Sequence, residues 1–503
     1  MMACIQKVNS STGNALLPQR LFLVFLFLFA IMIMYCLSLT LDWQMAGDTS
    51  PIHYTAWRIL QGDRLYEDVF DVSWPGSPLI HMLAIAVFGK TDFGFRMFDL
   101  LWICLLCASL FVFFQKPRWR GATAASLCFI ACYLAAGELD MQEREIQMLP
   151  FLILALHFIG LSVERKRSVF AFVAGFLLGF VVYIKPFPAV LLAMLLVFLL
   201  ITVPRNGDAR ATLAVVSSLC GGFLVPSALI HLWLWRMNAV QSFWQLVLFI
   251  HYRLYRGLNN TAAADVVSRF VVWTIPTWPV LVSMVRVRRI DPRMQLALIG
   301  LAYGLFHYFY QSKGWSQHVY IAAAFFLVTG FYSIDLVVRG TSTRWRYASV
   351  AFTAITLLLL SPLYLIRLER LKKVDLVYVQ SAMSDLLPLV KTANEVQPIE
   401  NMAGLINALY RLNLTIPARY LHSYPFYHST GDEQADAYFQ AMKADFIARL
   451  SEERVRIIIV DHDDVPRIQR EYPALAELLE HECYLHTSNE FYSIFVKREK
   501  VRG

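Results

Sequence analysis

Long apolar segments recur along the chain, separated by short polar stretches. Eleven of them are about 17 to 25 residues long, and a helix rising about 1.5 Å per residue then crosses roughly 30 Å of hydrocarbon. The pattern therefore predicts membrane-spanning helices at about residues 21–41, 97–114, 121–137, 146–162, 168–184, 187–203, 211–235, 269–285, 294–310, 318–338 and 346–366.

The composition agrees with a membrane protein and excludes an ordinary soluble one. Hydrophobic residues make up 57% of the 503 positions and charged residues 16%, far from soluble averages. No small-residue cleavage site follows the first apolar segment, so we expect a retained span. The net charge of +8 comes from short basic loops and needs no nucleic acid to explain it.

Lysine and arginine collect in every second loop, which predicts the orientation of the chain. Cytoplasmic loops carry an excess of these residues, so we expect a plasma (inner) membrane protein with a cytoplasmic N-terminus. The basic positions are Lys7, Arg20, Lys116, Arg118, Arg120, Arg165, Lys166, Arg167, Arg205, Arg210, Arg286, Arg288, Arg289, Arg293, Arg339, Arg344 and Arg346.

The first outer loop, from about residue 42 to 96, contains two further helical patterns. The run from Pro78 to Phe88 is too short to cross a membrane, with Ser77 expected to cap its start and Gly89 to end it. The run from Pro51 to Gly62 has an apolar face, with Arg58 off that face. Both predict helices lying along the membrane surface.

The composition changes after residue 366, and residues 367–503 are expected to form a small extracytoplasmic (periplasmic) α/β domain. Strand patterns lie at residues 455–460 and 492–496, and helical patterns at 435–449 and 473–482. Asp461, His462, Asp463 and Asp464 are expected to be a polar loop at a strand end, the alternative being a metal cluster. The remaining residues, 1–366, form the membrane domain.

Polar residues gather in the loops expected on the outer side. Asp48 precedes a predicted helix, where a half-desolvated carboxylate suits a general base or an anchor for a substrate hydroxyl, the plain alternative being a helix cap. Arg144 lies in an acidic loop at residues 138–145, and Lys185 interrupts two apolar runs. Lys313 and His318 flank Gly314-Trp315, and cations at a membrane surface suit a phosphate.

Each of these positions also has a plain structural explanation. A solvated loop, a lysine that snorkels to the interface and an aromatic loop anchored at the lipid surface would account for them. His157, His231 and His307 lie within spans and are expected to pack or to hydrogen-bond in the bundle, and Asp335 is expected to be solvated.

Taken in order, these residues resemble the GT-C superfamily of membrane glycosyltransferases, which includes protein O-mannosyltransferases and the lipid A aminoarabinose transferase. The likeness covers the whole chain in architecture: a helical polytopic protein of about eleven spans, two interfacial helices in the first outer loop and an outer C-terminal domain. The residues that carry it are Asp48 with Tyr54 and Trp57, Gly62 with Leu65, Tyr66 and Asp68, Asp71 with Pro75-Gly76, Phe88-Gly89 with Arg96, Glu143-Arg144-Glu145 with Pro150, Lys185-Pro186, and Gln311, Lys313-Gly314-Trp315 and His318.

The resemblance implies a polyprenyl-phosphate sugar donor, inversion at the anomeric carbon and catalysis by Asp48. Several relatives carry a lysine beside the proline that leads into the second interfacial helix, where this chain has Ser73-Trp74-Pro75. The donor phosphate is therefore expected to be held by Arg144, Lys185, Lys313 and His318. Other substrate contacts are expected from Arg58, Tyr66, Asp71, Trp74, Glu143, Gln311 and Trp315.

The expected chemistry needs a base and a cationic clamp, so no cofactor is required and a divalent metal stays optional. The acceptor is a hydroxyl of a lipid, a polysaccharide or a protein, and the pattern indicates neither the sugar nor the acceptor. Two alternatives remain open: a transporter or flippase of a lipid-linked sugar, and a glycan polymerase or ligase using a lipid-linked oligosaccharide. Transporters place their sites near the midplane between repeats, whereas the charges here collect at one surface.

Overall fold

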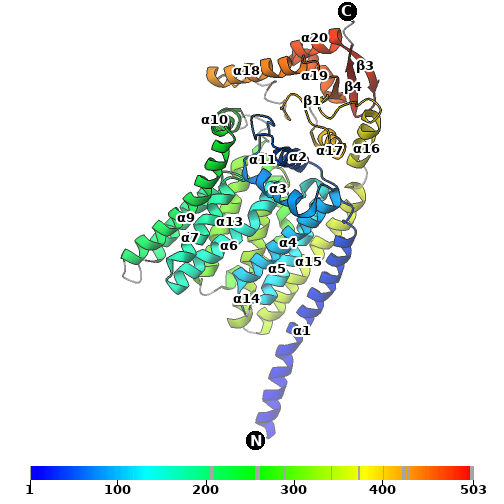
Figure 1. Cartoon of the computed structure of the whole chain (residues 1–503). Helices are drawn as coiled ribbons and strands as arrows, with labels where there is room; N and C mark the ends of the chain where they lie inside the picture. Colours follow the sequence, from blue (N-terminus) through cyan, green and yellow to red (C-terminus); the bar gives the residue numbers. More distant parts are fainter. Residues whose placement is uncertain are drawn as a thin grey trace, which may run out of the picture. The chain divides into compact units, whose positions relative to one another are not determined.

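A computed structural model gives the fold (Figure 1). It describes residues 2–116, 118–203, 209–254, 261–287, 290–340, 343–371, 374–399, 402–421, 426 and 430–498. Arg205, Arg288 and Arg289, expected in cytoplasmic loops, lie outside these ranges. The chain divides into a helix-bundle unit, Met1–Trp43, Arg96–Ala228 and Thr261–Leu371, and a sheet-bearing unit, Gln44–Phe95, Leu229–Asn260 and Lys372–Gly503. This grouping places the first loop with the C-terminal residues, unlike a simple division after residue 366.

Every apolar segment expected to span the membrane is helical. The helices wholly or mostly in the helix-bundle unit are α1 (Met2–Ser38), α4 (Asp92–Phe114), α5 (Trp119–Ala136), α6 (Arg144–Arg165), α7 (Ser168–Val182), α8 (Pro188–Thr202), α9 (Ala209–Arg236), α11 (Ala263–Thr274), α12 (Trp278–Leu281), α13 (Pro292–Gln311), α14 (Tyr320–Gly340) and α15 (Thr343–Leu371). Short 3₁₀ turns are η1 (Glu138–Asp140), η4 (Ile275–Thr277), η5 (Val282–Arg286) and η6 (Gln317–Val319).

Seven helical stretches in the described ranges are long and apolar enough to cross a membrane: Arg20–Ser38, Asp92–Phe114, Trp119–Ala136, Arg144–Arg165, Ala209–Arg236, Ala263–Arg286 and Gln317–Val338. Helices α7 and α8 are apolar but have 15 residues each. The protein is thus a multi-span membrane protein, while the count of eleven crossings stays a prediction.

Ion pairs join the ends of helices that are far apart in the sequence. Arg118 contacts Asp335 at 3.2 Å and Asp291 at 3.3 Å, and Arg293 contacts Glu164 at 2.7 Å. Arg293 also donates to the carbonyl of Phe113 at 2.9 Å. The expectation that Asp335 is solvated is wrong, because its side chain is 16% exposed and paired.

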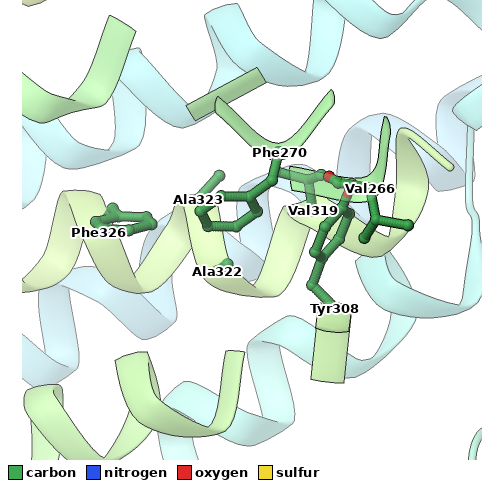
Figure 2. Close-up of a cluster of buried hydrophobic side chains, with 7 residues drawn as sticks. All are labelled: Val266, Phe270, Tyr308, Val319, Ala322, Ala323 and Phe326. Carbon is green, nitrogen blue, oxygen red and sulfur yellow. The ribbon is translucent and has the colours of Figure 1, made fainter. Parts of the chain in front are cut away.

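Three packed helices hold the loop between α13 and α14. Figure 2 shows Val266 and Phe270 of α11 against Tyr308 of α13 and Ala322 and Phe326 of α14. The Phe270 and Tyr308 ring centroids are 5.0 Å apart, and the Tyr308 hydroxyl donates to the carbonyl of Val266 at 3.0 Å. These contacts lie close to the end of α13 and the start of α14. They therefore fix the positions at which the loop of residues 312–316 begins and ends.

The sheet-bearing unit holds both helices expected in the first loop, α2 (Thr49–Leu60) and α3 (Gly76–Phe88). Gly89 ends α3 with φ 79°, as expected. The expected cap by Ser77 is wrong, since α3 already begins at Gly76 and Ser77 lies in its first turn. The unit's other helices are α10 (Val240–Gln245), the π-helix η3 (Leu246–Leu254), α16 (Val374–Leu386), α17 (Met402–Arg411), α18 (Glu433–Leu450), η8 (His462–Asp464), α19 (Val465–Glu471) and α20 (Pro473–Glu482).

A four-stranded sheet of order β1-β2-β4-β3 forms the centre of the C-terminal residues, with β1 (Val396–Ile399), β2 (Ile457–Asp461), β3 (Cys483–Ser488) and β4 (Tyr492–Lys497). Strand β1 is parallel to β2, in the register Val396 with Ile457, and the other pairs are antiparallel. The strands expected near 455–460 and 492–496 are β2 and β4. Strands β1 and β3 carried no signal, because β1 is short and β3 is mostly exposed.

Helices α7 and α9 pack backbone against backbone through glycines. A Cβ built on Gly222 would overlap the carbonyl oxygen of Phe172, and one on Gly179 would overlap that of Phe223. In lipid, where no hydrophobic force drives helices together, such close contact is the main source of association.

We therefore expect Gly222→Ala to lower the thermal unfolding midpoint, corresponding to about 1 to 3 kcal/mol of overpacking. Gly221→Ala is the matched control, since a Cβ there meets nothing within 4 Å. Thermal unfolding of the purified proteins in one detergent measures both. Equal midpoints for the two variants would contradict the close packing of α7 on α9.

Candidate functional site

A buried carboxylate, Glu145, lies at the centre of the polar residues in the helix-bundle unit. It is in the first turn of α6 and is fully buried. Its Oε1 atom accepts a hydrogen bond from Lys185 Nζ at 2.5 Å and lies 3.0 Å from His307 Nε2 and 3.8 Å from His318 Nε2. Residues from three remote parts of the sequence therefore meet at one oxygen.

Lys185 reaches Glu145 from the turn between α7 and α8. Its side chain is 11% exposed. Burial lowers the pKa of Lys185, as does Arg144, whereas Glu145 and Glu143 act in the opposite direction. The interpretation of Lys185 as a freely snorkelling residue is wrong, because its ammonium is paired inside the protein.

The loop after α13 contributes His318 and carries Lys313. Both are buried, with 2% and 3% exposure, and burial lowers the pKa of Lys313. The Trp315 ring lies 5.3 Å from that of His318, and Gln311 Nε2 donates to the carbonyl of His307 at 3.0 Å. The loop is therefore built into the protein rather than merely anchored at a surface.

The acidic loop before α6 is fixed from two sides. Asp140 accepts hydrogen bonds from the Tyr320 hydroxyl at 3.0 Å and from Ser316 Oγ at 3.3 Å. Gln142 donates to Asp99 at 2.9 Å, and its φ of 55° is an uncommon conformation for a residue with a side chain. Such backbone persists where the surroundings enforce it, and here it leads directly into Glu143.

Asp99 is itself held in a buried network on α4. It pairs with Arg96 and accepts from the Tyr133 hydroxyl at 2.6 Å. Arg96 also donates to the carbonyl of Thr40 at 3.0 Å. The network links the end of α1 to the loop that carries Glu143, which is 2% exposed and precedes α6, and Arg144, the first residue of that helix.

Asp48 occupies the position before α2 in the sheet-bearing unit. Its side chain makes no capping hydrogen bond to the helix, so the plain capping explanation finds no support. The side chain of Asp48 is exposed, and its part in catalysis stays a prediction. An exposed carboxylate beside a helix N-terminus is accessible to a reactant.

Several residues expected to contact substrate are tied into the protein. Arg58, expected off the apolar face, is 6% exposed; its guanidinium pairs with Asp63 and donates to the Tyr54 hydroxyl at 3.2 Å. Asp71 is fully buried and accepts from Thr55 Oγ1 at 3.2 Å. The contacts of Arg58 and Asp71 therefore support the structure of the first loop.

Tyr66 and Trp74 surround Phe243 in the same unit. The Tyr66 ring stacks on the Phe243 ring with 6.0 Å between the ring centroids, and the Trp74 ring meets Phe243 edge-on with 5.3 Å between the centroids. The Tyr66 hydroxyl donates to the carbonyl of Ser73 at 2.8 Å. Tyr66 is 1% exposed, while Trp74 is only half-buried and so has surface to offer.

Residues of α17 and of the segment that follows it contact α2 and the residues before it. The Tyr54 hydroxyl accepts from Ile416 N at 2.8 Å and donates to the carbonyl of Leu414 at 3.1 Å. Asn407 Nδ2 donates to the carbonyl of Met45 at 2.8 Å. The C-terminal residues therefore support the segment in which Asp48 lies.

Sequence reasoning missed Glu145 as a site residue. It expected His307 to pack or to hydrogen-bond in the bundle, and the hydrogen bond is confirmed, although its partner Glu145 was not foreseen. The signal for both was present, because an ionisable residue within an apolar span needs a partner and by default marks a functional site. Within the described ranges, no three His, Cys, Asp or Glu side chains are grouped as for a metal ion.

Comparisons with known proteins bear on this arrangement. Residues 73–233 match the family model described as dolichyl-phosphate-mannose-protein mannosyltransferase. A sequence comparison with curated proteins gives no match. Among solved structures, ArnT from Cupriavidus metallidurans bound to undecaprenyl phosphate aligns with a TM-score of 0.60 at 10% identity, covering 95% of this chain and 98% of that one.

Two further structures are similar. The apo form of the same ArnT gives a TM-score of 0.59 at 10% identity, over 93% of this chain and 97% of that one. The Archaeoglobus fulgidus oligosaccharyltransferase gives 0.49 at 10% identity, over 94% and 74%. The fold of this chain is similar to that of ArnT over nearly the whole length of both chains, and the resemblance expected from the sequence is confirmed at the level of the fold.

The Lys185 and Glu145 pair has a testable consequence for stability. Removing one partner of a buried ion pair leaves the other uncompensated, which is strongly destabilising. We expect Lys185→Met and Glu145→Gln each to lower the thermal unfolding midpoint, and the double variant to lose less than their sum, with a coupling of about 1 to 3 kcal/mol. Additive losses would show that the two groups do not interact.

Proposed function

We propose that the protein is an inverting glycosyltransferase that moves a sugar, a hexose or a pentose, from a polyprenyl-phosphate donor to an acceptor hydroxyl. The reaction takes place on the extracytoplasmic face, and the acceptor belongs to a lipid, a polysaccharide or a protein of the cell envelope. The observation that carries the proposal is the buried cluster in which Lys185 and His318 approach Glu145, in a chain with the GT-C fold.

The cluster suits an anion that arrives on a lipid. A phosphate at the edge of an apolar bundle needs cationic donors that are already desolvated and in place. Lys185 is mostly buried and Lys313 is buried. Arg144 is the first residue of α6 and directly precedes Glu145. Arginine and lysine together supply both a planar fork and a point charge to phosphate oxygens. The relative that the chain resembles over 98% of its length was solved with undecaprenyl phosphate bound.

The proposed reaction is a single displacement. The acceptor hydroxyl gives its proton to the base, its oxygen forms a bond to the anomeric carbon, and the bond from that carbon to the phosphate oxygen breaks. The electron pair of the broken bond leaves with the polyprenyl phosphate, whose added charge the cations stabilise. One in-line displacement inverts the anomeric carbon.

Asp48 is proposed as the base. Its side chain is exposed, so a hydroxyl can reach the carboxylate. The residues before and after it are held, because Met45 is bonded to Asn407 and Tyr54 to the segment around Ile416. A base on a supported segment needs little reorganisation when the acceptor binds.

Removal of the base tests the proposal. A strain lacking the protein should accumulate an unused polyprenyl-phosphate sugar, and Asp48→Asn should fail to reverse this. In purified protein, transfer should fall by roughly 10²- to 10⁴-fold, the usual loss for a general base, with donor binding nearly unchanged.

The matched control is Asp42→Asn, an exposed aspartate in the same loop, which should restore transfer. Near-normal turnover of Asp48→Asn would show that Asp48 is not the base. Movement of the donor across the membrane without a new glycosidic bond would instead favour a flippase.

Charge removal tests the phosphate site. Lys313→Ala and Arg144→Ala should each weaken binding of the polyprenyl-phosphate donor by roughly 10- to 100-fold, since hydrogen bonds to charged groups contribute about 1.5 to 3 kcal/mol. Donor titration into purified variants of matched thermal stability measures the effect. Arg470→Ala, an exposed cation on α19, and Glu482→Ala are controls that should bind normally, and equal affinity in all variants would remove Lys313 and Arg144 from the site.

A further inference from the structure

Lys185 is a buried lysine with an acidic partner at hydrogen-bond distance. The ammonium lies 2.5 Å from Glu145 Oε1, and Glu145 has no exposed surface. Lys185 comes from the turn between α7 and α8, and Glu145 from the first turn of α6. The contact therefore fixes a flexible side chain at a point where three helices begin or end.

The same carboxylate oxygen is also bound to His307. A carboxylate only accepts hydrogen bonds, so His307 Nε2, 3.0 Å away, must carry a hydrogen. The other ring nitrogen lies 3.4 Å from the Tyr303 hydroxyl. Glu145 Oε1 is thus held from α13 as well, which fixes the orientation of the carboxylate toward Lys185.

Two buried polar atoms in this cluster have no hydrogen-bond partner within the described residues. They are Glu145 Oε2 and His318 Nδ1. A buried polar atom left unpaired costs about 1 to 3 kcal/mol, so such atoms commonly mark a place that a ligand or water completes. His318 Nε2 is 3.8 Å from Glu145 Oε1, too long for a hydrogen bond.

An ammonium has three N–H donors. One is used on Glu145, so the group can keep that contact while it binds a phosphate oxygen. Glu145 therefore does not compete with the phosphate of the sugar donor for Lys185. The ammonium can contact the Glu145 carboxylate and the phosphate at the same time.

We infer that Glu145 is a positioning residue of the donor-phosphate site, which holds Lys185 in place and in its charged form so that it can bind the phosphate. The inference rests on the proposed function, because it assigns Lys185 to the donor phosphate.

The charges around Lys185 show why a partner is needed. Burial and the neighbouring Arg144 lower the pKa of Lys185, while Glu145 and Glu143 raise it. His307 of α13 and His318 of η6 also face the group. Without the charge of Glu145 the ammonium would lose its proton at a lower pH, and a neutral amine binds phosphate poorly.

The test is the pH profile of binding of undecaprenyl phosphate to the full-length protein in one detergent, between about pH 7.5 and 10, where the phosphate stays doubly charged. For Glu145→Gln, the affinity should begin to fall at least about one pH unit below the point where it falls in the natural protein, by up to tenfold per unit. In Glu145→Gln with Lys185→Arg, this early fall should vanish, because arginine keeps its charge over the whole range.

Two further variants separate this role from a structural one. Glu164→Gln removes a carboxylate at the other end of α6, where it pairs with Arg293, and should leave the profile unchanged. Glu145→Asp keeps the charge, so its profile should fall at the natural pH even if affinity is lower throughout. If Glu145→Gln does not fold, Glu145→Asp is the variant measured in its place.

The outcomes are distinct. A Glu145→Gln profile that is merely lower at every pH, without rescue by Lys185→Arg, would overturn the inference and leave Glu145 as a structural residue. A profile identical to that of the natural protein would also overturn it. If the natural protein does not bind undecaprenyl phosphate at any pH, the proposed donor class fails instead.

Discussion

The cost of burying the Glu145 carboxylate in an apolar bundle is the constraint on which the candidate site depends. A desolvated charge must be met by a partner and by hydrogen bonds, or it is not retained. Lys185 and His307 meet it from the turn after α7 and from α13, and His318 stands nearby before α14. The start of α6, the turn between α7 and α8, the end of α13 and the loop after it are therefore held in one arrangement.

A second set of buried polar contacts organises the sheet-bearing unit. Tyr54 and Arg58 of α2 bind the backbone at Leu414 and Ile416, and Asn407 binds that of Met45. The C-terminal residues are thus structural partners of the first loop. This explains why residues 44–95 group with residues 372–503, although more than 270 positions lie between them in the sequence. Support of this kind allows Asp48 to be exposed and still lie on a defined segment.

The corrections to the sequence predictions share one physical cause. Arg58, Lys185 and Asp335 were each placed at a surface by the polarity of their immediate neighbours. Each instead has a partner on another part of the chain: Ile416 for Arg58, Glu145 for Lys185, and Arg118 for Asp335. Local polarity indicates that an ionisable group needs compensation, but not which remote group provides it.

The sequence by itself determined the elements, because their signals are local. Runs of apolar residues predict helices α1, α4 to α9 and α11 to α15, Gly89 ends α3, and β-branched runs mark β2 and β4. It also offered Arg144, Lys185, Lys313 and His318 as candidates for binding an anion, an assignment that stays a prediction. Only the tertiary structure decided that Glu145 joins Lys185 to the histidines, that Asp99 fixes the strained Gln142, and that glycines bring α7 against α9. Those contacts join residues far apart in the chain, and they depend on how helices pack in three dimensions.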